Sequence, residues 1–251
     1  MVIRPYERIV FPLDNMSFTE AMSWAKRLRG RVGVLKVGLE LFTRSGPEAV
    51  RMVRDFGFEC FLDLKIHDIP RTAALAVEAA VRMGAGFVDI HASSGVAAMQ
   101  AASLACLSDG DLKTSLLAVT LLTSLGTGAV DRIWPGSRPE QIVLGLAEMA
   151  NDAGCHGLIC SPQEVARLRA RFGYALIIMT PGLRLPDSPQ DDQKRIGFVS
   201  DAFASGANYG VIGTPIREAS SPDAVLDQIA EDIAFALDEP GSVLCGGVAR
   251  A

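Results

Sequence analysis

The chain contains 251 residues, of which 49% are hydrophobic and 21% are charged, and its formal net charge is −5 at pH 7. This length suits one large α/β barrel or two small domains, and the hydrophobic content is sufficient for a substantial core. The negative net charge and the scattered basic residues argue against a nucleic-acid-binding surface.

Short apolar runs alternate with longer amphipathic runs along the chain. The expected strands cover residues 8–14, 32–38, 60–68, 87–93, 115–123, 156–161, 175–182 and 209–214. The expected helices cover residues 18–30, 47–57, 71–84, 95–108, 138–154, 162–173, 196–206 and 221–239. This repetition predicts parallel strands joined by crossover helices, and eight units in about 250 residues is the size of a (β/α)8 barrel.

The fold class expected from this pattern is α/β, as a single (β/α)8 TIM barrel. One domain would span residues 1–251, with a poorly ordered tail at about 239–251. A doubly wound open sheet is the alternative, but such a sheet usually has fewer units at this length. In addition, no GxGxxG motif follows the first strand.

Neither a signal peptide nor a membrane span is predicted, because charged residues and Pro5 interrupt residues 1–14 and the uncharged run 114–130 breaks at Gly126. The five cysteines form no CxxC pair, so we expect reduced, buried thiols in a cytoplasmic protein. The three histidines lack metal-ligand spacing, and we expect neither a metal site nor a cofactor. His91, two residues after Asp89, could orient another side chain.

The segment CFLDLKIHDIP, residues 60–70, carries three charged residues inside an apolar run. In a strand, Asp63 and Lys65 point to one face while Leu62, Leu64 and Ile66 point to the other. Asp68 follows the strand, before Pro70. A single Asp–Lys pair there could be a purely structural ion pair. Whether the pair is structural or functional therefore depends on which residues lie at the other strand ends.

Polar residues also lie at the carboxyl ends of other expected strands, where the active site of such a barrel is found. They are Asp14, Lys36, Thr123, Ser124, Arg184, Gln193 in the loop that follows, Gly213 and Thr214. Together with Asp63, Lys65 and Asp68, the charged members predict a network at the barrel mouth rather than an isolated ion pair.

This network suggests a particular chemistry. A lysine among carboxylates stays protonated, so Lys65 would be a proton donor rather than a nucleophile. A carboxylate fixed beside it would repel an anionic group of the substrate, as a decarboxylation requires. Arg184, Gln193 and backbone amides at the last two strands suit a phosphate. The expected substrate is therefore a small phosphorylated anion.

Several segments resemble the orotidine 5'-phosphate decarboxylase family. The segment DLKIHDIPRT (63–72) is similar to its DxKxxD signature, and five further segments match in the same order: LD at 13–14, LKVGLELF at 35–42, VTLLTS at 119–124, TPGLR at 180–184 and DDQKR at 191–195. The resemblance covers residues from about 7 to 235. It implies a cofactor-free enzyme that converts orotidine 5'-monophosphate to UMP in pyrimidine biosynthesis.

The resemblance also implies a role for each matching residue. Lys65 would protonate C6, Asp63 would lie against the departing carboxylate, and Lys36 and Asp68 would complete the charge network. Other substrate contacts would come from Asp14 and Lys36 at the ribose, Thr123 at the pyrimidine, and Arg184, Gln193, Gly213 and Thr214 at the phosphate. Asp68, Ile69 and Thr72 would enter the site of the other subunit of a homodimer.

Two departures from the family pattern lie on the phosphate side. The family usually ends strand eight with Gly-Arg, whereas Thr214 follows Gly213 here, and Phe198-Val199 occupies the place of a usual Thr-Pro. Arg217 either replaces the missing cation or is a solvated surface residue. Two alternative functions stay open: a metal-dependent sugar-phosphate decarboxylase or synthase of the same superfamily, and a nucleotide-binding barrel with weak catalysis. Lys36 argues against the first, because an ammonium cannot ligate a metal.

Overall fold

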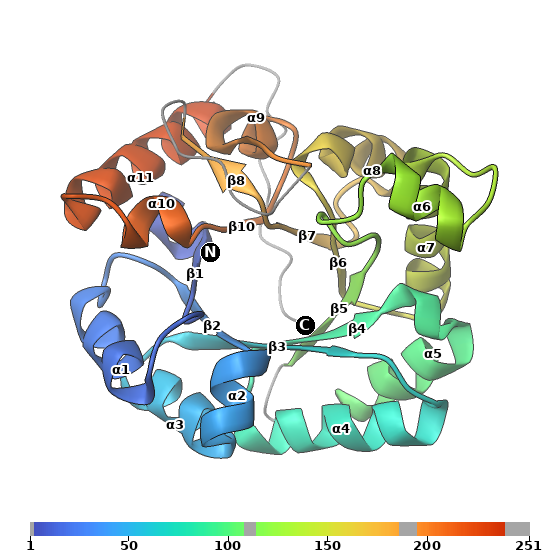
Figure 1. Ribbon diagram of the computed structural model, residues 1–251, viewed down its shortest axis with the longest axis horizontal. Helices are drawn as coiled ribbons and strands as arrows, with labels where there is room; N and C mark the ends of the chain where they lie inside the picture. Colours follow the sequence, from blue (N-terminus) through green and yellow to red (C-terminus); the bar gives the residue numbers. More distant parts are fainter. Residues whose placement is uncertain (1–2, 108–113, 186–194, 239–251) are drawn as a thin grey trace.

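The computed structural model describes residues 3–107, 114–185 and 195–238. Within these ranges, eight parallel strands close into a barrel in the order β1-β10-β7-β6-β5-β4-β3-β2 (Figure 1). The strands are β1 (Ile9–Pro12), β2 (Val34–Gly38), β3 (Glu59–Ile66), β4 (Phe87–His91), β5 (Ser115–Val119), β6 (Gly157–Ile159), β7 (Ile177–Thr180) and β10 (Tyr209–Val211).

Helices surround the barrel as an outer ring (Figure 1). They are α1 (Phe18–Arg27), α3 (Pro47–Asp55), α4 (Pro70–Met83), α5 (Val96–Ala105), α7 (Pro139–Asp152), α8 (Val165–Phe172), α9 (Val199–Ala204) and α11 (Pro222–Asp238). The expected α/β fold, a single (β/α)8 TIM barrel, is confirmed. The alternative of an open sheet is wrong, because β1 pairs with both β2 and β10 and leaves no edge there. The expected tail at about 239–251 lies outside the described residues.

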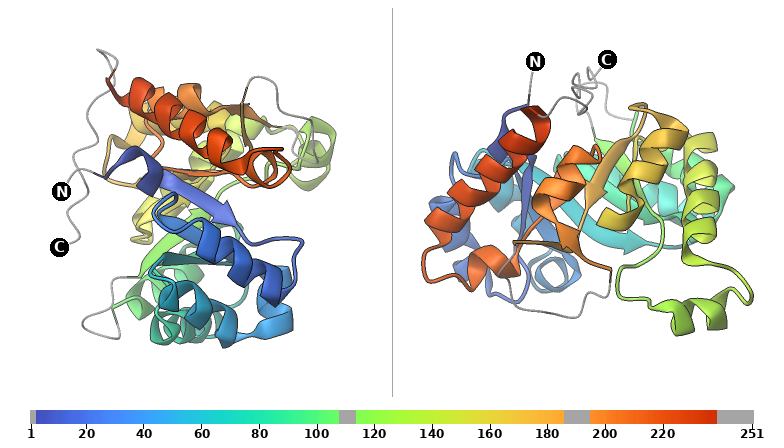
Figure 2. Two further views of the ribbon diagram at one scale, coloured as in Figure 1. Left: turned by 90° about the vertical axis from the view of Figure 1, so that its left-hand side faces the viewer. Right: turned by 90° about the horizontal axis from the view of Figure 1, so that it is seen from above.

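Shorter elements modify this pattern. α2 (Leu39–Ser45), α6 (Thr127–Ile133) and α10 (Thr214–Arg217) follow β2, β5 and β10, and α6 and α10 lie at the same end of the barrel (Figure 2). β8 (Leu183–Arg184) pairs with β9 (Gly197–Phe198), so the helix expected from residue 196 begins only at Val199. Within the described ranges, the 3-10 turns are η1 (Pro5–Arg8), η2 (Ala92–Ser94) and η3 (Pro162–Glu164).

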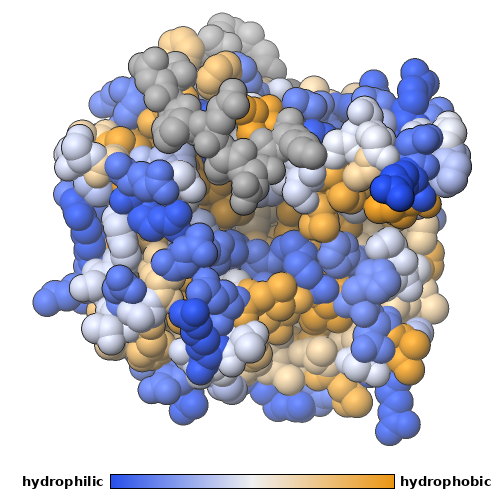
Figure 3. Space-filling view, in the orientation of Figure 1, coloured by the Kyte–Doolittle hydropathy of each residue, from blue (hydrophilic) through white to orange (hydrophobic). Residues whose placement is uncertain are grey.

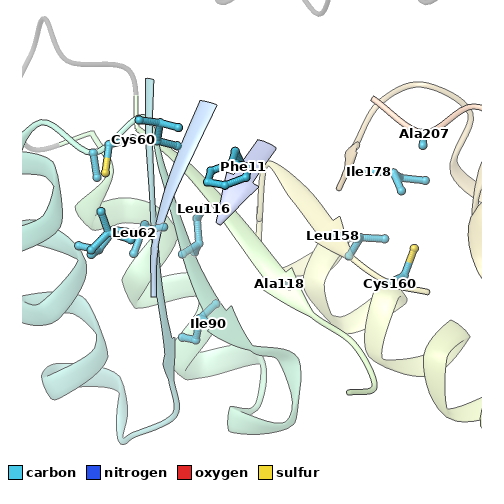
Figure 4. Close-up of a cluster of buried hydrophobic side chains, with 14 of the residues drawn as sticks. Phe11, Cys60, Leu62, Ile90, Leu116, Ala118, Leu158, Cys160, Ile178 and Ala207 are labelled. Carbon is cyan, nitrogen blue, oxygen red and sulfur yellow. The ribbon is translucent and has the colours of Figure 1, made fainter. Parts of the chain in front are cut away.

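The alternation of side chains along each strand produces two apolar layers. The inner cluster fills the barrel and consists of Val10, Val34, Phe61, Phe87, Leu117, Val119, Ile159 and Met179. The outer cluster packs between the strands and the helices. Figure 4 shows part of the outer cluster, including Leu62, Ile90 and Leu116 from three neighbouring strands. The barrel interior is therefore closed by side chains, and ligands can enter only at an end.

Local sequence signals fix several helix ends. Ser17 accepts a hydrogen bond from the Glu20 amide at the start of α1, and the Glu20 carboxylate accepts one from the Ser17 amide. Gly84 ends α4 with a φ of 79°, in the left-handed region that glycine adopts without a steric penalty. The four cysteines within the described ranges are buried and reduced, as expected. Among the helices that are described, none has the length and apolar character to span a membrane.

Candidate active site

A cavity of about 290 Å³ opens at the carboxyl ends of the barrel strands. In Figure 3, hydrophilic side chains gather across the middle of the face that Figure 1 shows, where the barrel opens. Eight of the predicted site residues line this cavity: Asp14, Lys36, Asp63, Lys65, Thr123, Arg184, Gly213 and Thr214. Residues from several different strands or the loops that follow them thus converge on one place, as the position of active sites in this fold requires.

Charged side chains form an alternating chain across the cavity floor. The Lys36 ammonium lies 2.9 Å from Asp14 Oδ2 and 3.0 Å from Asp63 Oδ2. The Lys65 ammonium contacts Asp63 Oδ1 and lies 2.7 Å from Asp89 Oδ2. The order is therefore Asp14, Lys36, Asp63, Lys65, Asp89, and each ammonium lies between two carboxylates.

Most of these charges are shielded from solvent. The side chain of Asp14 is 39% exposed, those of Lys36, Asp63 and Lys65 are 10%, 13% and 26% exposed, and that of Asp89 is completely buried. Removing charges from water is costly unless they are paired. The alternation of sign satisfies that condition, because every carboxylate of the chain contacts at least one ammonium.

The network shifts the pKa of several of its members. Burial favours the neutral forms of Lys36 and Lys65, but the adjacent carboxylates outweigh it and raise the pKa of both ammonium groups. For Asp63 burial is likewise outweighed, here by Lys36 and Lys65, and its pKa is lowered. Asp89 contacts only one ammonium, so burial and the Asp63 carboxylate raise its pKa to about 7. Lys65 is consequently an ammonium, and Asp63 a carboxylate, across the physiological pH range.

The strand that carries Asp63 and Lys65 is irregular. β3 pairs with β4 through Leu62 and Val88 and again through Ile66 and Ile90, with a register shift between the two points. Lys65 has a φ of 52°, a conformation that costs a non-glycine residue energy. The prediction that Asp63 and Lys65 face the same side is confirmed, since both line the cavity, but the regular strand assumed for it is wrong at Lys65.

Two arginine side chains also line the cavity. Arg184, in β8, is buried. Arg217, at the end of α10, lines the same cavity and donates from Nη1 to the Asp14 backbone carbonyl oxygen at 2.9 Å. Its side chain is 23% exposed, and Nη2 lies 3.7 Å from Glu218 Oε1. Of the two interpretations of Arg217, the solvated surface residue is therefore wrong: the guanidinium reaches back to the barrel mouth.

The predicted residues at the beginning of α4 do not line this cavity. Asp68, Ile69 and Thr72 are exposed at the beginning of α4, and Asp68 Oδ1 accepts a hydrogen bond from the Ile69 amide at 2.7 Å. Within one chain, Asp68 does not line the cavity. Gln193 lies outside the described residues.

Sequence reasoning missed Asp89 as a member of the charge network. The signal was present, because Asp89 interrupts the apolar strand FVDIH just as Asp63 interrupts its own strand. The sequence pattern connected Asp89 only with His91. The ring of His91 lies 5.6 Å from that of His67, and burial together with the Lys65 charge lowers the pKa of His91.

Among the residues that the structure describes, no group of three or more His, Cys, Asp or Glu side chains is arranged so that it could hold a metal ion. The two carboxylates Asp14 and Asp63 do approach one another, but the ammonium of Lys36 lies between them. The Lys36 ammonium thus occupies the position between these two carboxylates that a metal ion would need.

Comparisons with known proteins agree with this arrangement. Residues 7–229 match the model of the orotidine 5'-phosphate decarboxylase / HUMPS family. A protein of Syntrophotalea carbinolica named orotidine 5'-phosphate decarboxylase is 40% identical over 243 residues, which are 95% of this chain and 100% of that protein. One of Marinomonas sp. with the same name is 43% identical over 225 residues, covering 90% of this chain and 96% of the relative.

A solved structure is similar over most of the chain. The crystal structure of orotidine 5'-phosphate decarboxylase from Lactobacillus acidophilus superimposes with a TM-score of 0.80 at 30% sequence identity. The superposition covers 90% of this chain and 99% of that one. The family match, from residue 7 to residue 229, includes every barrel strand that contributes to the cavity.

Proposed function

Because this chain belongs to the orotidine 5'-phosphate decarboxylase / HUMPS family, we propose that it is a carboxy-lyase that converts orotidine 5'-monophosphate to UMP and CO2, a step of pyrimidine biosynthesis. The observation that carries the proposal is the chain of alternating charges from Asp14 to Lys65 on the cavity floor, with Asp89 buried beneath it. It offers a proton donor that is charged before the reaction, beside a carboxylate that is ionised, and a decarboxylation can use both.

The chemical step assigns one role to each of two residues. The bond between C6 and the substrate carboxylate breaks, its electron pair remains on C6, and CO2 leaves. The Lys65 ammonium then delivers a proton from Nζ to C6, and the lysine is left as a neutral amine. The raised pKa of Lys65 ensures that this proton is present before the reaction, and general acid catalysis of this type is worth about 10²- to 10⁴-fold in rate.

Asp63 acts on the group that leaves. Its lowered pKa keeps it ionised beside Lys65, so the substrate carboxylate would lie against a second negative charge. The loss of CO2 relieves this repulsion, and the same carboxylate holds the Lys65 ammonium next to the carbon that it protonates. Lys36 keeps Asp63 in place from the other side, at 3.0 Å.

The other cavity residues would bind the parts of the substrate that do not react. Asp14 and Lys36 suit the ribose hydroxyls, and Thr123 suits a polar edge of the pyrimidine ring. Arg184, Arg217 and the start of α10 at Gly213 and Thr214 lie together at the cavity and offer cationic and backbone donors for the phosphate. Gln193 would join them, as expected from the sequence.

We further propose that the active form is a homodimer in which Asp68, Ile69 and Thr72 complete the neighbour's site. Ile69, the residue just before α4, is 67% exposed, and Leu75, within α4, is 53% exposed. Exposed apolar residues in one region of the surface favour a protein partner. Asp68 lies in the same exposed region, and a second subunit would place its charge beside a cavity.

A spectrophotometric assay of orotidine 5'-monophosphate decarboxylation, with and without EDTA, tests the proposed function. We expect turnover that EDTA does not change. Turnover that EDTA abolishes would favour the metal-dependent enzymes of the superfamily, and binding of UMP without turnover would favour a barrel that has lost its catalysis. Either result would refute the proposal.

A further inference from the structure

Asp89 is the most completely buried charged residue at the barrel mouth, and the mechanism above gives it no role. Its exposed fraction is 0%, and it does not line the cavity. It lies on β4 between Val88 and Ile90, at the point where β3 and β4 lose their register. Its neighbour on β5 is apolar Leu117. Burying a carboxylate in such surroundings is costly unless hydrogen bonds or an ion pair compensate it.

The register shift between β3 and β4 provides hydrogen-bond partners for this carboxylate. Between the pairs Leu62–Val88 and Ile66–Ile90, β3 advances by four residues while β4 advances by two. The extra residues form a bulge, whose amides cannot all find partners in the ladder. The amides of Leu64 and Lys65 both donate to Asp89 Oδ1, at 3.0 and 2.9 Å. A single carboxylate oxygen thus replaces the missing strand partners.

The same carboxylate also holds the Lys65 side chain. Asp89 Oδ2 lies 2.7 Å from Lys65 Nζ, so one residue binds both the backbone amide and the ammonium of Lys65. The backbone of Lys65 has a φ of 52°, which persists only where surrounding contacts compensate its cost. The two amide bonds to Oδ1 are such contacts, and the conformation that they stabilise is the one that turns the ammonium toward Asp63.

We propose that Asp89 is the positioning residue of the proton donor, acting from beneath the cavity by holding the bulge of β3 and the ammonium of Lys65 in one arrangement. The proposal rests on the proposed function, in which Lys65 protonates the substrate. It separates two properties of Asp89. The acceptor oxygen toward the two amides is essential, whereas the negative charge is not, because Asp63 also contacts the ammonium.

Two substitutions separate these properties. Asp89→Asn keeps an amide oxygen that can accept from Leu64 and Lys65, removes the negative charge, and replaces the oxygen that accepts from the Lys65 ammonium by an NH2 group. Asp89→Val has a similar shape but offers no acceptor, so the bulge loses both hydrogen bonds. Thr114→Val is the matched control: Thr114 Oγ1 donates to the Ala85 carbonyl oxygen at 2.7 Å in a buried position beside the other end of β4, far from Lys65 in the fold.

The measurement is kcat per UMP-binding site, with sites counted by calorimetric titration with UMP, so that unfolded protein does not lower the value. We expect Asp89→Asn to keep kcat within about fivefold of wild type. We expect Asp89→Val to lower kcat by about 100-fold or more. The UMP dissociation constant should change by less than about threefold in both variants, because Asp89 does not line the cavity. Thr114→Val should match the wild type. If Asp89→Val binds no UMP, Asp89→Ser replaces it, since its hydroxyl lies one bond closer to the backbone than Asp89 Oδ1 and cannot accept from both amides, and we expect a loss of about tenfold or more.

Three outcomes would overturn the proposal: kcat of Asp89→Val (or its replacement Asp89→Ser) within about threefold of wild type, a loss in Asp89→Asn as large as in Asp89→Val, or a loss of UMP affinity that parallels the loss of kcat. The second would assign the effect to charge, and the third to general damage of the site. The wild-type protein in the same assay reports on the decarboxylase proposal separately. Wild-type turnover combined with a silent Asp89→Val would refute the role of Asp89 alone.

Discussion

Arg217 offers a direct test of how the chain binds the phosphate of its proposed substrate. The resemblance to the family leads us to expect an arginine where Thr214 stands, and a threonine hydroxyl is a neutral and weaker partner for a phosphate. Arg217 lies three residues further on and still lines the cavity. Its Nη1 is held by the Asp14 carbonyl oxygen at 2.9 Å, which fixes the guanidinium at the mouth.

The size of the effect follows from these contacts. A hydrogen bond between a charged group and its partner is worth about 1.5–3 kcal/mol, and every 1.4 kcal/mol is about tenfold in an equilibrium. The competing ion pair with Glu218 is long, at 3.7 Å, and Glu218 is 57% exposed, so solvent screens it and it offsets little of this gain. Arg217→Ala should therefore lower kcat/KM by about tenfold to 150-fold, and Thr214→Arg should add little to the wild type.

Steady-state kcat/KM with orotidine 5'-monophosphate measures both variants. Arg171→Ala is a suitable control, because Arg171 is an exposed arginine with a carboxylate partner, Glu148, and it does not line the cavity. A silent Arg217→Ala together with a Thr214→Arg that gains about tenfold would show that no cation replaces the missing one. Silence in both variants would show that Arg184 and the backbone amides suffice, and the reasoning about Arg217 would be wrong.

Further predictions concern the network and the assembly. Lys65→Ala should fold normally and lose at least about 10²- to 10⁴-fold in kcat; near wild-type turnover would exclude Lys65 as the proton donor. Mixing inactive Lys65→Ala with inactive Asp68→Ala should restore part of the activity, because both substitutions can fall in one site of a mixed dimer and leave the other site intact. No recovery after demonstrated subunit exchange would mean that each site is built from one chain. Burial and Asp63 raise the pKa of Asp89 from 3.8 to about 7, so between those values the folded chain keeps a proton that the unfolded chain has released, and stability falls as pH rises. Asp89→Asn should lack this part of the fall in urea denaturation at about pH 4.5 and pH 7, and an equal fall in both proteins would contradict the assignment.

The architecture and much of the site are encoded in local patterns of the sequence. Alternating strand and helix patterns are local properties of the chain, and eight of them leave few architectures open. Parallel strands must also end at a common edge, so the sequence alone predicts that Asp14, Lys36, Asp63 and Lys65 meet. They do meet, and ion pairs at 2.9 and 3.0 Å join Lys36 to Asp14 and Asp63.

The way in which those charges are held depends instead on tertiary contacts. The alternation rule applies to a regular strand, and nothing in the residues of β3 reveals that its register against β4 shifts between Leu62 and Ile66. That shift depends on the pairing of two strands, as does the placement of Asp89 opposite the bulge. Likewise, the turn of α10 directs Arg217 back to the cavity. Contacts between elements distant in the chain are set by register and by the path of the chain in space, and the residue pattern of one element alone does not contain them.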